Sequence, residues 1–392
     1  MYSEEDINSA VAAGALSAEA AQSFRSHMTR MRELPRASEE NFRLLNSFND
    51  IFVSIGIVIL LLAVGAIGQA IGGAIAPAQD FFTFMNSNPS EAEMAAWQAA
   101  NSANEAWSTA LAGILVAAAA WPLAEFFTRK RRMALPSILL LLAFVGGVLA
   151  TMVGLLFYVM GNDGSDQLAG VMVSIATLAA AAAAFIHWRR FQVPITVAAG
   201  TAAVAGTVIA LIAAAVGPEN IDTNTILTLV FVAGLAVFAF AMRWDMSDTA
   251  RTTRRSDVAF WLHLLAAPMI AHPIFSLIGV TGGENIGVGA AIGVVAVYIA
   301  FGLIALAVDR RALLVSALAY VLFALTFLFR EFGAVELNFA LTALVIGSAL
   351  LSLSAFWQPI RRGVVSALPE GWQARLPATA DIDMVTATPS AA

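Results

Sequence analysis

Ten long apolar stretches, separated by polar connections, follow one another between residues 51 and 357. A helix rises about 1.5 Å per residue and the hydrocarbon layer of a membrane is about 30 Å thick, so each stretch is long enough to cross it. In lipid only a helix satisfies the backbone of a single segment, so the pattern predicts an all-α, polytopic transmembrane helical bundle of about ten spans. The predicted spans are approximately 51–75, 106–127, 134–160, 168–188, 193–216, 225–242, 258–278, 286–308, 312–329 and 337–357.

The composition agrees with lipid as the main solvent. Of the 392 residues, 59% are hydrophobic and 12% are charged, whereas about 25% of the residues of an average soluble domain are charged. The chain has no cysteine and a net charge of −6, and it contains no phosphate-binding loop, zinc motif or nucleophile elbow. The sequence therefore predicts no cofactor, no metal and no nucleic-acid partner, and it gives little support to an enzyme.

Basic residues mark every second connection between the apolar stretches. Arg330 is the one exception among the 21 lysines and arginines. The other twenty lie before residue 50, at 129–132, at 189–190, between 243 and 255, at 310–311 and after residue 360. Because Lys and Arg are retained in cytoplasmic loops, this alternation predicts ten spans with both termini in the cytoplasm. Setting the topology is the expected role of these arginines, and binding of anionic lipid is the alternative.

The opposite connections carry acids, and the longest of them, residues 76–105, is also rich in aromatic side chains. Ser90 followed by Glu91 and Glu93 has the pattern of a helix start. We expect residues 90–104 to form a short helix on the outer membrane surface, next to an interfacial belt of aromatic residues.

Polar segments flank the predicted spans. Residues 1–49 contain helix-start patterns and are predicted to form a cytoplasmic helical appendage, too small for an independent enzyme domain but able to contact a protein partner. A third helix of this appendage is expected to begin at Ser38 and to run into the first span. Residues 50–360 would form the ten-span domain, and residues 361–392 have the composition of a flexible cytoplasmic tail.

Four of the basic connections resemble one another. Each places paired arginines just before an apolar stretch, in RKRRMALP, WRRFQVP, TRRSDVAF and DRRALLV. A repeated two-helix unit would produce this pattern, and so would the common need of cytoplasmic turns for arginine. Two five-span halves of inverted topology, as in many transporters, are a third division that the number of spans allows.

The seventh stretch contains the residues that most suggest a polar site, namely His263, Pro268, His272 and Pro273. Ionisable residues within a span and prolines that remove helical hydrogen bonds both mark polar sites in membrane proteins, so we expect a kinked or interrupted helix. Nine residues at about 100° each place the two histidines on opposite faces, about 13 Å apart along the axis, so they would not form one site unless the prolines reorient them. The alternative is that both histidines bond neighbouring backbone and only stabilise the kink.

Glu125, near the inner end of the second stretch, completes the candidate intramembrane polar site. Its helical spacing from Arg129 predicts an ion pair, and a role in gating or proton coupling is the alternative. His187, at the inner end of the fourth stretch, is expected to anchor that helix at the interface. Two Gly-x-x-x-Gly pairs, at 68–72 and 289–293, predict close helix packing.

Several segments resemble a known group of proteins. The opening INSAVAAGALSAEAAQSF, the arginine-punctuated hairpins and RRSDVAFWLHLLAAPMIAHPIF resemble polytopic inner-membrane proteins of Gram-negative bacteria whose function is unknown. The resemblance covers most of the chain through loose motifs. It implies a bacterial inner membrane and brings no catalytic or binding residues. The number of spans is also that of drug and metabolite exporters, although no motif of theirs aligns with this sequence.

Ten spans, a proline-containing seventh helix and intramembrane histidines favour a transporter or permease of a small solute or ion, with proton coupling. A membrane scaffold, assembly factor or envelope sensor is the alternative, and an intramembrane enzyme that uses His263 and His272 is a third hypothesis. Histidines that line a polar cavity and have charged partners from other helices would favour transport. Histidines packed among apolar helices, with local carbonyl partners, would favour the scaffold.

Overall fold

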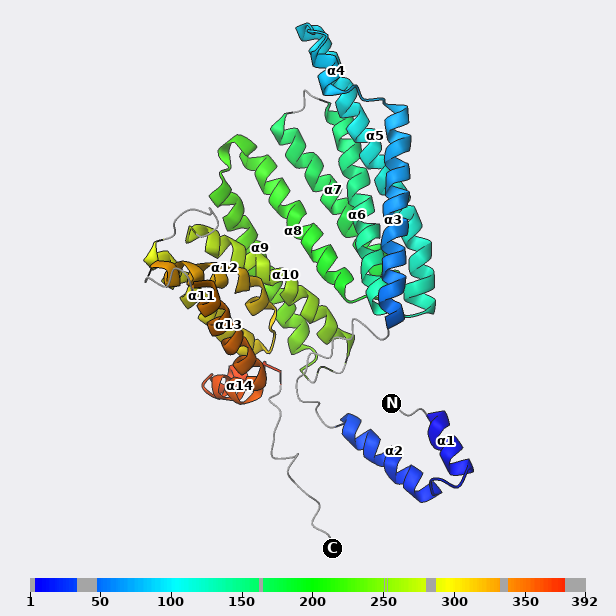
Figure 1. Cartoon of the computed structure of the whole chain (residues 1–392), viewed down its shortest axis with the longest axis vertical. Coiled ribbons are helices and arrows are strands. Elements are labelled where there is room, and N and C mark those ends of the chain that lie inside the picture. The colour runs from blue at the N-terminus through cyan, green and yellow to red at the C-terminus, as the bar shows by residue number, and fades with distance from the viewer. Residues whose placement is uncertain are drawn as a thin grey trace.

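The computed structural model describes residues 4–33, 48–161, 165–249, 251, 253–279, 287–331 and 338–377, and all regular secondary structure in these residues is helical (Figure 1). The appendage is a hairpin of α1 (Glu4–Ala12) and α2 (Ala18–Glu33), apart from the main bundle. Gly14 turns the chain after α1 with a φ of 72°, and the Ser17 hydroxyl accepts from the Ala20 amide at the start of α2. The helix expected to begin at Ser38 lies outside the described residues.

A helix is present at each of the ten predicted apolar stretches. These helices are α3 (Phe48–Ile75), α5 (Glu91–Ala124), α6 (Ala134–Met160), α7 (Asp166–Phe191), α8 (Ile195–Val216), α9 (Thr223–Met246), α10 (Arg254–Leu277), α11 (Val288–Val308), α12 (Ala312–Glu331) and α13 (Asn338–Ala355). Among the described residues, eight of them, α3 and α5 to α11, are long and apolar enough to span a membrane. Helix α13 adds a ninth if it is counted together with α14 (Trp357–Ser366), from which a bend of 76° separates it.

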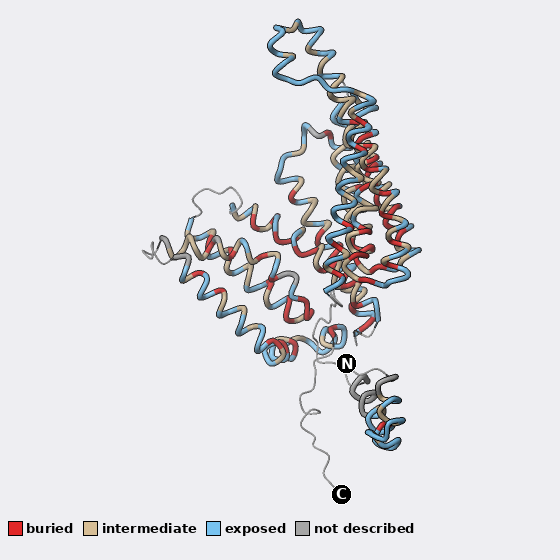
Figure 2. The backbone as a smooth tube through the Cα atoms, turned by 45° about the vertical axis from the view of Figure 1, so that its right-hand side comes forward, coloured by how far each residue is buried: buried red, intermediate tan, exposed pale blue. Residues whose placement is uncertain are grey.

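The helices form two groups that meet along α8 and α10. The first group contains α3 and α5 to α8, and the second contains α9 to α14. Helix α10 contacts α8, α9 and α12. In its most apolar segment of 18 residues, 56% is buried, against 17–33% in the corresponding segments of the other seven candidate spans. Buried residues are concentrated where the helices face one another (Figure 2). Many large apolar residues of the same helices remain exposed. Helix α10 is therefore the central helix of the second group.

Four antiparallel helix pairs, α5–α6, α7–α8, α9–α10 and α11–α12, share a feature of their backbone at the turn. Each turn contains a non-glycine residue in the left-handed conformation, with φ between 54° and 59°: Arg132, Gln192, Arg251 and Asp309. Such residues are uncommon in proteins, and only one other, Asn88, occurs among the described residues. If the four pairs are copies of one repeated two-helix unit, a left-handed residue at the turn is a feature that all copies would share.

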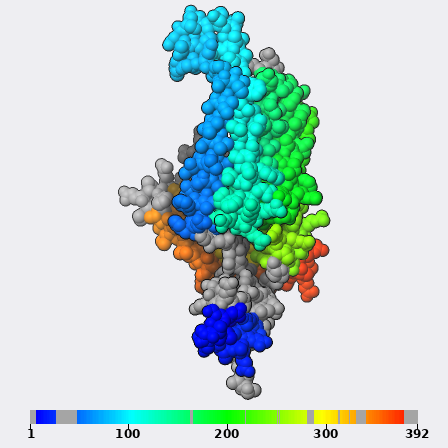
Figure 3. Space-filling model, turned by 90° about the vertical axis from the view of Figure 1, so that its right-hand side faces the viewer, coloured from blue at the N-terminus to red at the C-terminus, as the bar shows by residue number. Residues whose placement is uncertain are grey.

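Helix α3 lies along α5 and α6 for most of its length (Figure 3), and two of its glycines make this possible. A Cβ atom on Gly68 or Gly72 would lie 2.6 or 2.4 Å from backbone atoms of α5. The predicted close packing at this pair is confirmed. The prediction is wrong for the second pair, because a Cβ on Gly289 would meet nothing within 4 Å and one on Gly293 only Ile278 at 3.9 Å.

Substituting Gly72→Val is expected to destabilise the first group by about 1–3 kcal/mol, the usual cost of inserting atoms into a packed contact. The valine Cβ would collide with the backbone of α5, which cannot move aside as a side chain can. Gly56→Val is the matched control, since Gly56 lies in the same helix with open space around its Cβ position. Thermal unfolding in detergent measures both, and an equal loss in the two variants would contradict the assigned contact.

Residues 90–104 do not form the separate surface helix expected from the sequence. Helix α5 begins at Glu91, with Ser90 and Glu93 forming a capping box, and runs unbroken to Ala124. The segment therefore continues the axis of the second predicted span beyond the other helices (Figure 1), because no proline or glycine lies within it to end the helix. The short helix α4 (Phe81–Met85) covers this extension, and the Phe84 ring stacks on Trp97 with 5.5 Å between centroids.

The chain after α13 also differs from the expectation of a flexible tail beginning at residue 361. Helix α14 and the short α15 (Glu370–Gln373) follow, and structure is described as far as Pro377. Arg361 is fully buried, and its Nη2 donates to the carbonyl of Pro377 at 2.6 Å. Trp357, Arg361 and Val365, spaced four apart, form the buried stripe of α14. Residues 378–392 lie outside the described part.

Candidate functional site

Helix α10, which carries the predicted site residues, runs without interruption from Arg254 to Leu277. Of the expected kink or interruption, the interruption is not present. Pro268 is exposed and Pro273 is buried, and both lie inside the helix. Each proline removes one helical donor, but contacts with α8, α9 and α12 hold the helix in place.

His263 faces α9 and is almost completely buried, with 2% of its side chain exposed. Its Nε2 lies 2.8 Å from Oδ2 of Asp245, a distance at which a protonated Nε2 donates a hydrogen bond to the carboxylate. Asp245 lies in the last turn of α9 and is 1% exposed. The histidine thus has a charged partner from another helix, which is one of the two features that would favour transport, the other being a polar cavity that the histidine lines.

Arg310, in the turn between α11 and α12, binds the same carboxylate with two nitrogens. Its Nη2 donates to Oδ1 of Asp245 at 2.6 Å and its Nε to Oδ2 at 3.3 Å. Nη2 also lies 3.1 Å from the carbonyl oxygen and 3.2 Å from the hydroxyl of Ser256, at the start of α10. We call Asp245, Ser256, His263 and Arg310 the buried ionic network. It joins α9, α10 and the α11–α12 turn.

A second ionic cluster adjoins this network through the backbone, since Asp309 directly precedes Arg310. Arg251 Nη1 donates to Oδ2 of Asp309 at 2.8 Å, and Trp357 Nε1 donates to Oδ1 at 2.6 Å. Arg361 Nε lies 3.7 Å from Oδ1. The α9–α10 turn, the α11–α12 turn and α14 are therefore held around one buried carboxylate.

The two sets have different charge balances. In the buried ionic network one aspartate and one arginine cancel, and His263 decides the net charge. The second cluster surrounds one aspartate with two arginines. Buried charges are costly unless they are paired, so the protonation state of His263 determines whether the network is neutral or carries one positive charge. Within the described residues no group of three or more His, Cys, Asp or Glu side chains is placed to hold a metal ion.

His272 does not join this network. It is exposed, and its Nδ1 lies 2.6 Å from the hydroxyl of Tyr320 on α12. The Tyr320 ring stacks on Phe275, with centroids 4.4 Å apart. His263 faces α9 and His272 faces α12, which agrees with the opposite faces that their spacing in a helix predicts.

Glu125 lies in a π-helical turn, η1 (Glu125–Lys130), that ends the α5 span after Pro122. Its carboxylate pairs with Arg129 at 3.3 Å, as the spacing predicted, and with Arg190 of α7 at 2.6 Å. The partners of Glu125 all belong to the first helix group, and those of His263 to the second. The structure therefore separates Glu125 from the histidines.

His187 is fully buried, which differs from its expected role as an interfacial anchor. The rings of Trp121, Phe144 and Phe191 surround it, the nearest being Phe191 at 4.5 Å between centroids. Its Nδ1 lies 3.5 Å from the Thr196 hydroxyl. Its Nε2 has no hydrogen-bond partner in the part of the chain that the structure describes.

The residues missing from the sequence-based site are Asp245, Asp309, Arg310 and Arg361. All four lie outside the predicted apolar stretches, in connections or in the predicted tail, where charges are ordinarily solvated. One signal was available: Asp245 lies only three residues beyond the predicted end of the sixth apolar stretch, in the segment MRWDMSD, and α9 continues as far as Met246. An acid at that position can face the interior of the bundle as readily as water.

The helices are apolar and expose large apolar residues on their outer faces, and they surround a central helix that carries polar residues. This arrangement is that of a multi-pass integral membrane protein. No protein-family model, curated protein or solved structure matches the chain. The function is therefore inferred from the geometry of the site.

Proposed function

We propose that the chain is a ten-span protein of a bacterial inner membrane, with both termini in the cytoplasm, that moves a small solute with coupling to protons. The observation that carries the proposal is the buried contact of His263 with Asp245 of α9, whose carboxylate also binds Arg310 of the α11–α12 turn. Ionisable residues inside a membrane bundle are costly and are characteristic of proton and ion pathways.

Protonation of His263 would change what holds the second helix group together. With neutral His263, the pair of Asp245 and Arg310 is balanced. With protonated His263, the buried set carries one uncompensated positive charge, and a buried unpaired charge favours rearrangement or entry of water. The α11–α12 turn, which carries Arg310, would then be held less firmly against α9 and α10. A proton would thereby open the arginine-rich end of this group.

Transport assays in proteoliposomes test the proposal. A panel of small solutes is presented across a pH gradient, and a gradient-driven flux is expected for at least one solute. His263→Gln keeps an amide donor toward Asp245 but cannot titrate, so its flux is expected to lose its pH dependence. His272→Gln is the control and should keep that dependence. The transport proposal would be rejected if no solute of the panel were moved and if adding the solutes left the thermal stability of the protein unchanged.

The orientation of the chain in the membrane can be tested separately. Because the chain has no native cysteine, only an introduced cysteine can react. Asn220 and Ser247 are exposed residues at opposite ends of α9. In intact cells, Asn220→Cys is expected to react with a membrane-impermeant maleimide, and Ser247→Cys only after permeabilisation. This follows from the positive-inside distribution of arginine. The reverse pattern would invert the proposed topology.

A scaffold or envelope sensor that binds a protein through residues 1–49 is the second candidate. The α1–α2 hairpin, closed by a 2.7 Å hydrogen bond from Arg25 to Asn8, favours it because the hairpin lies apart from the bundle and most of its described side chains are exposed. Flux in proteoliposomes, measured with and without residues 1–33, separates the two candidates. A transporter should keep its flux in proteoliposomes, whereas a scaffold should show none with or without the hairpin.

A further inference from the structure

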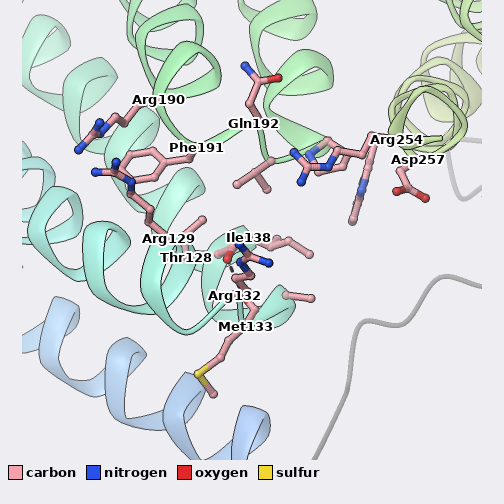
Figure 4. Close-up of a pocket in the computed structure, with 15 residues that line it drawn as sticks. Thr128, Arg129, Arg132, Met133, Ile138, Arg190, Phe191, Gln192, Arg254 and Asp257 are labelled. Atoms are coloured by element: carbon pink, nitrogen blue, oxygen red, sulfur yellow. Dashed lines mark hydrogen bonds between the residues drawn. The ribbon is translucent and has the colours of Figure 1, made fainter. Parts of the chain in front are cut away.

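A cavity of about 620 Å³ lies between η1, α6, the α7–α8 turn and α10 (Figure 4). Its charged and amide side chains come from three regions that are distant in sequence, near the α5–α6 turn, the α7–α8 turn and the start of α10: Arg129, Arg132, Arg190, Gln192, Arg254 and Asp257. Figure 4 shows Arg129 and Arg190 together on one side, Arg254 and Asp257 on the other, and Arg132 between them. We call this space the basic cavity. Its volume falls in the usual range for small-molecule sites, about 300–1,000 Å³.

The lining of the basic cavity has a strong excess of positive charge, with four arginines against one aspartate. Glu125 lies behind two of them and pairs with Arg129 and Arg190. Arg132 and Arg254 form no ion pair within 4 Å in the described part of the chain. Two guanidinium groups, that of Arg254 beside Asp257 on one side of the cavity and that of Arg132 between the two sides, therefore remain available to an anion.

Apart from Thr128 and Ser137, the remaining lining is apolar and includes Met133, Ile138, Phe191 and Trp261. A ligand that fills the cavity would thus meet arginines and an apolar wall together. Guanidinium groups match phosphate oxygens in geometry and charge. Basic pockets between membrane helices on the cytoplasmic side are suited to anionic headgroups. An apolar wall beside them suits the glycerol backbone and the first carbons of acyl chains.

We propose that the basic cavity binds the phosphate-bearing headgroup of an anionic phospholipid. The site joins the two helix groups, since η1, α6 and the α7–α8 turn belong to the first and α10 to the second. A bound headgroup would attach the central helix α10 to the first group at its arginine-rich end. The proposal does not rest on transport, because binding can be measured without flux.

The test uses the full chain in a neutral detergent, titrated with dioctanoyl phosphatidylglycerol, with intrinsic tryptophan fluorescence as the readout because Trp261 lines the cavity. The cavity variant is Arg132→Gln combined with Arg254→Gln. Its control is Arg131→Gln combined with Arg255→Gln, which removes the same charge from the same two turns but leaves the lining intact. The cavity variant is expected to bind roughly 10- to 30-fold more weakly, since each arginine near a headgroup contributes about a factor of five. The control should stay within about twofold of the wild type.

Three further measurements complete the test. Thermal unfolding without lipid should be the same for both double variants, which shows that the cavity variant is folded. Dioctanoyl phosphatidylcholine, which has no net charge, should bind far more weakly than phosphatidylglycerol. Glycerol 3-phosphate distinguishes a lipid from a soluble phosphate. If it binds as tightly as phosphatidylglycerol, the lipid assignment is overturned, and an equal loss of binding in the two double variants overturns the site itself.

Discussion

Replacing Asp245 with alanine is expected to lower the free energy of unfolding by about 3–5 kcal/mol, the usual cost of removing one partner from a buried ion pair. Arg310 would lose both of its contacts with the carboxylate, and His263 its partner on α9. Both side chains would remain buried, with 4% and 2% of their area exposed. Denaturant or thermal unfolding in detergent measures the loss.

Asp222→Ala is the matched control for this prediction. Asp222 is exposed, caps the start of the same helix and accepts from the Thr225 amide at 2.8 Å. Its loss should cost only about 0.5–2 kcal/mol. Combining Asp245→Ala with Arg310→Met should be less harmful than the sum of the single changes, because the second change removes the charge that the first leaves unpaired. A loss no greater than that of Asp222→Ala would show that the network contributes little to stability.

The second large effect is expected at Asp309, where alanine should cost about 3–5 kcal/mol. Alanine removes the acceptor of both Arg251 and Trp357. It also has to adopt the left-handed backbone of this position, with φ 59°, without a polar side chain to favour it. Asp309→Asn separates these causes, because asparagine tolerates the backbone and keeps an oxygen for Trp357 while losing the charge.

The expected order of stability is wild type, then Asp309→Asn, then Asp309→Ala. Limited proteolysis supplies a local readout, since Trp357 is the first residue of α14 and holds that helix to the α11–α12 turn. Cleavage near residue 356 should accelerate in the same order. Equal cleavage rates in all three proteins would mean that other contacts hold α14.

The positions of the helices were predictable because they depend on local composition. Every predicted apolar stretch contains a helix, since a single apolar segment in lipid has no other way to satisfy its backbone. The ends were less predictable. Residues 90–104 continue α5 because nothing in their sequence ends a helix, and Arg361 belongs to a helix because its neighbours at positions 357 and 365 are buried with it.

The candidate site was predicted only in part, since a contact depends on which turns meet in space. His263 was identified from its place in an apolar stretch, but its partners lie 18 residues away at Asp245 and, beyond that carboxylate, at Arg310. Arginine in a turn fits the rule for topology equally well whether it faces water or a buried acid. The two glycine pairs also show that a sequence motif alone does not determine a contact. The pair at 68–72 lies against a neighbouring backbone, and the pair at 289–293 does not.

The position of α10 has a consequence for how the protein is made. This helix is the least apolar of the eight candidate spans, with a mean hydropathy of 1.6 against 1.8–2.8 for the others, and it is also the most buried. A nascent helix of this kind gains little from lipid and is held mainly by its neighbours. The ribosome delivers α8 and α9 first, but Arg310 emerges 65 residues after Asp245. Biogenesis should therefore pass through a stage at which α10 is inserted while Asp245 of α9 still lacks its arginine partner. A chain arrested before residue 310 is expected to be the form most readily recognised by membrane quality-control proteases.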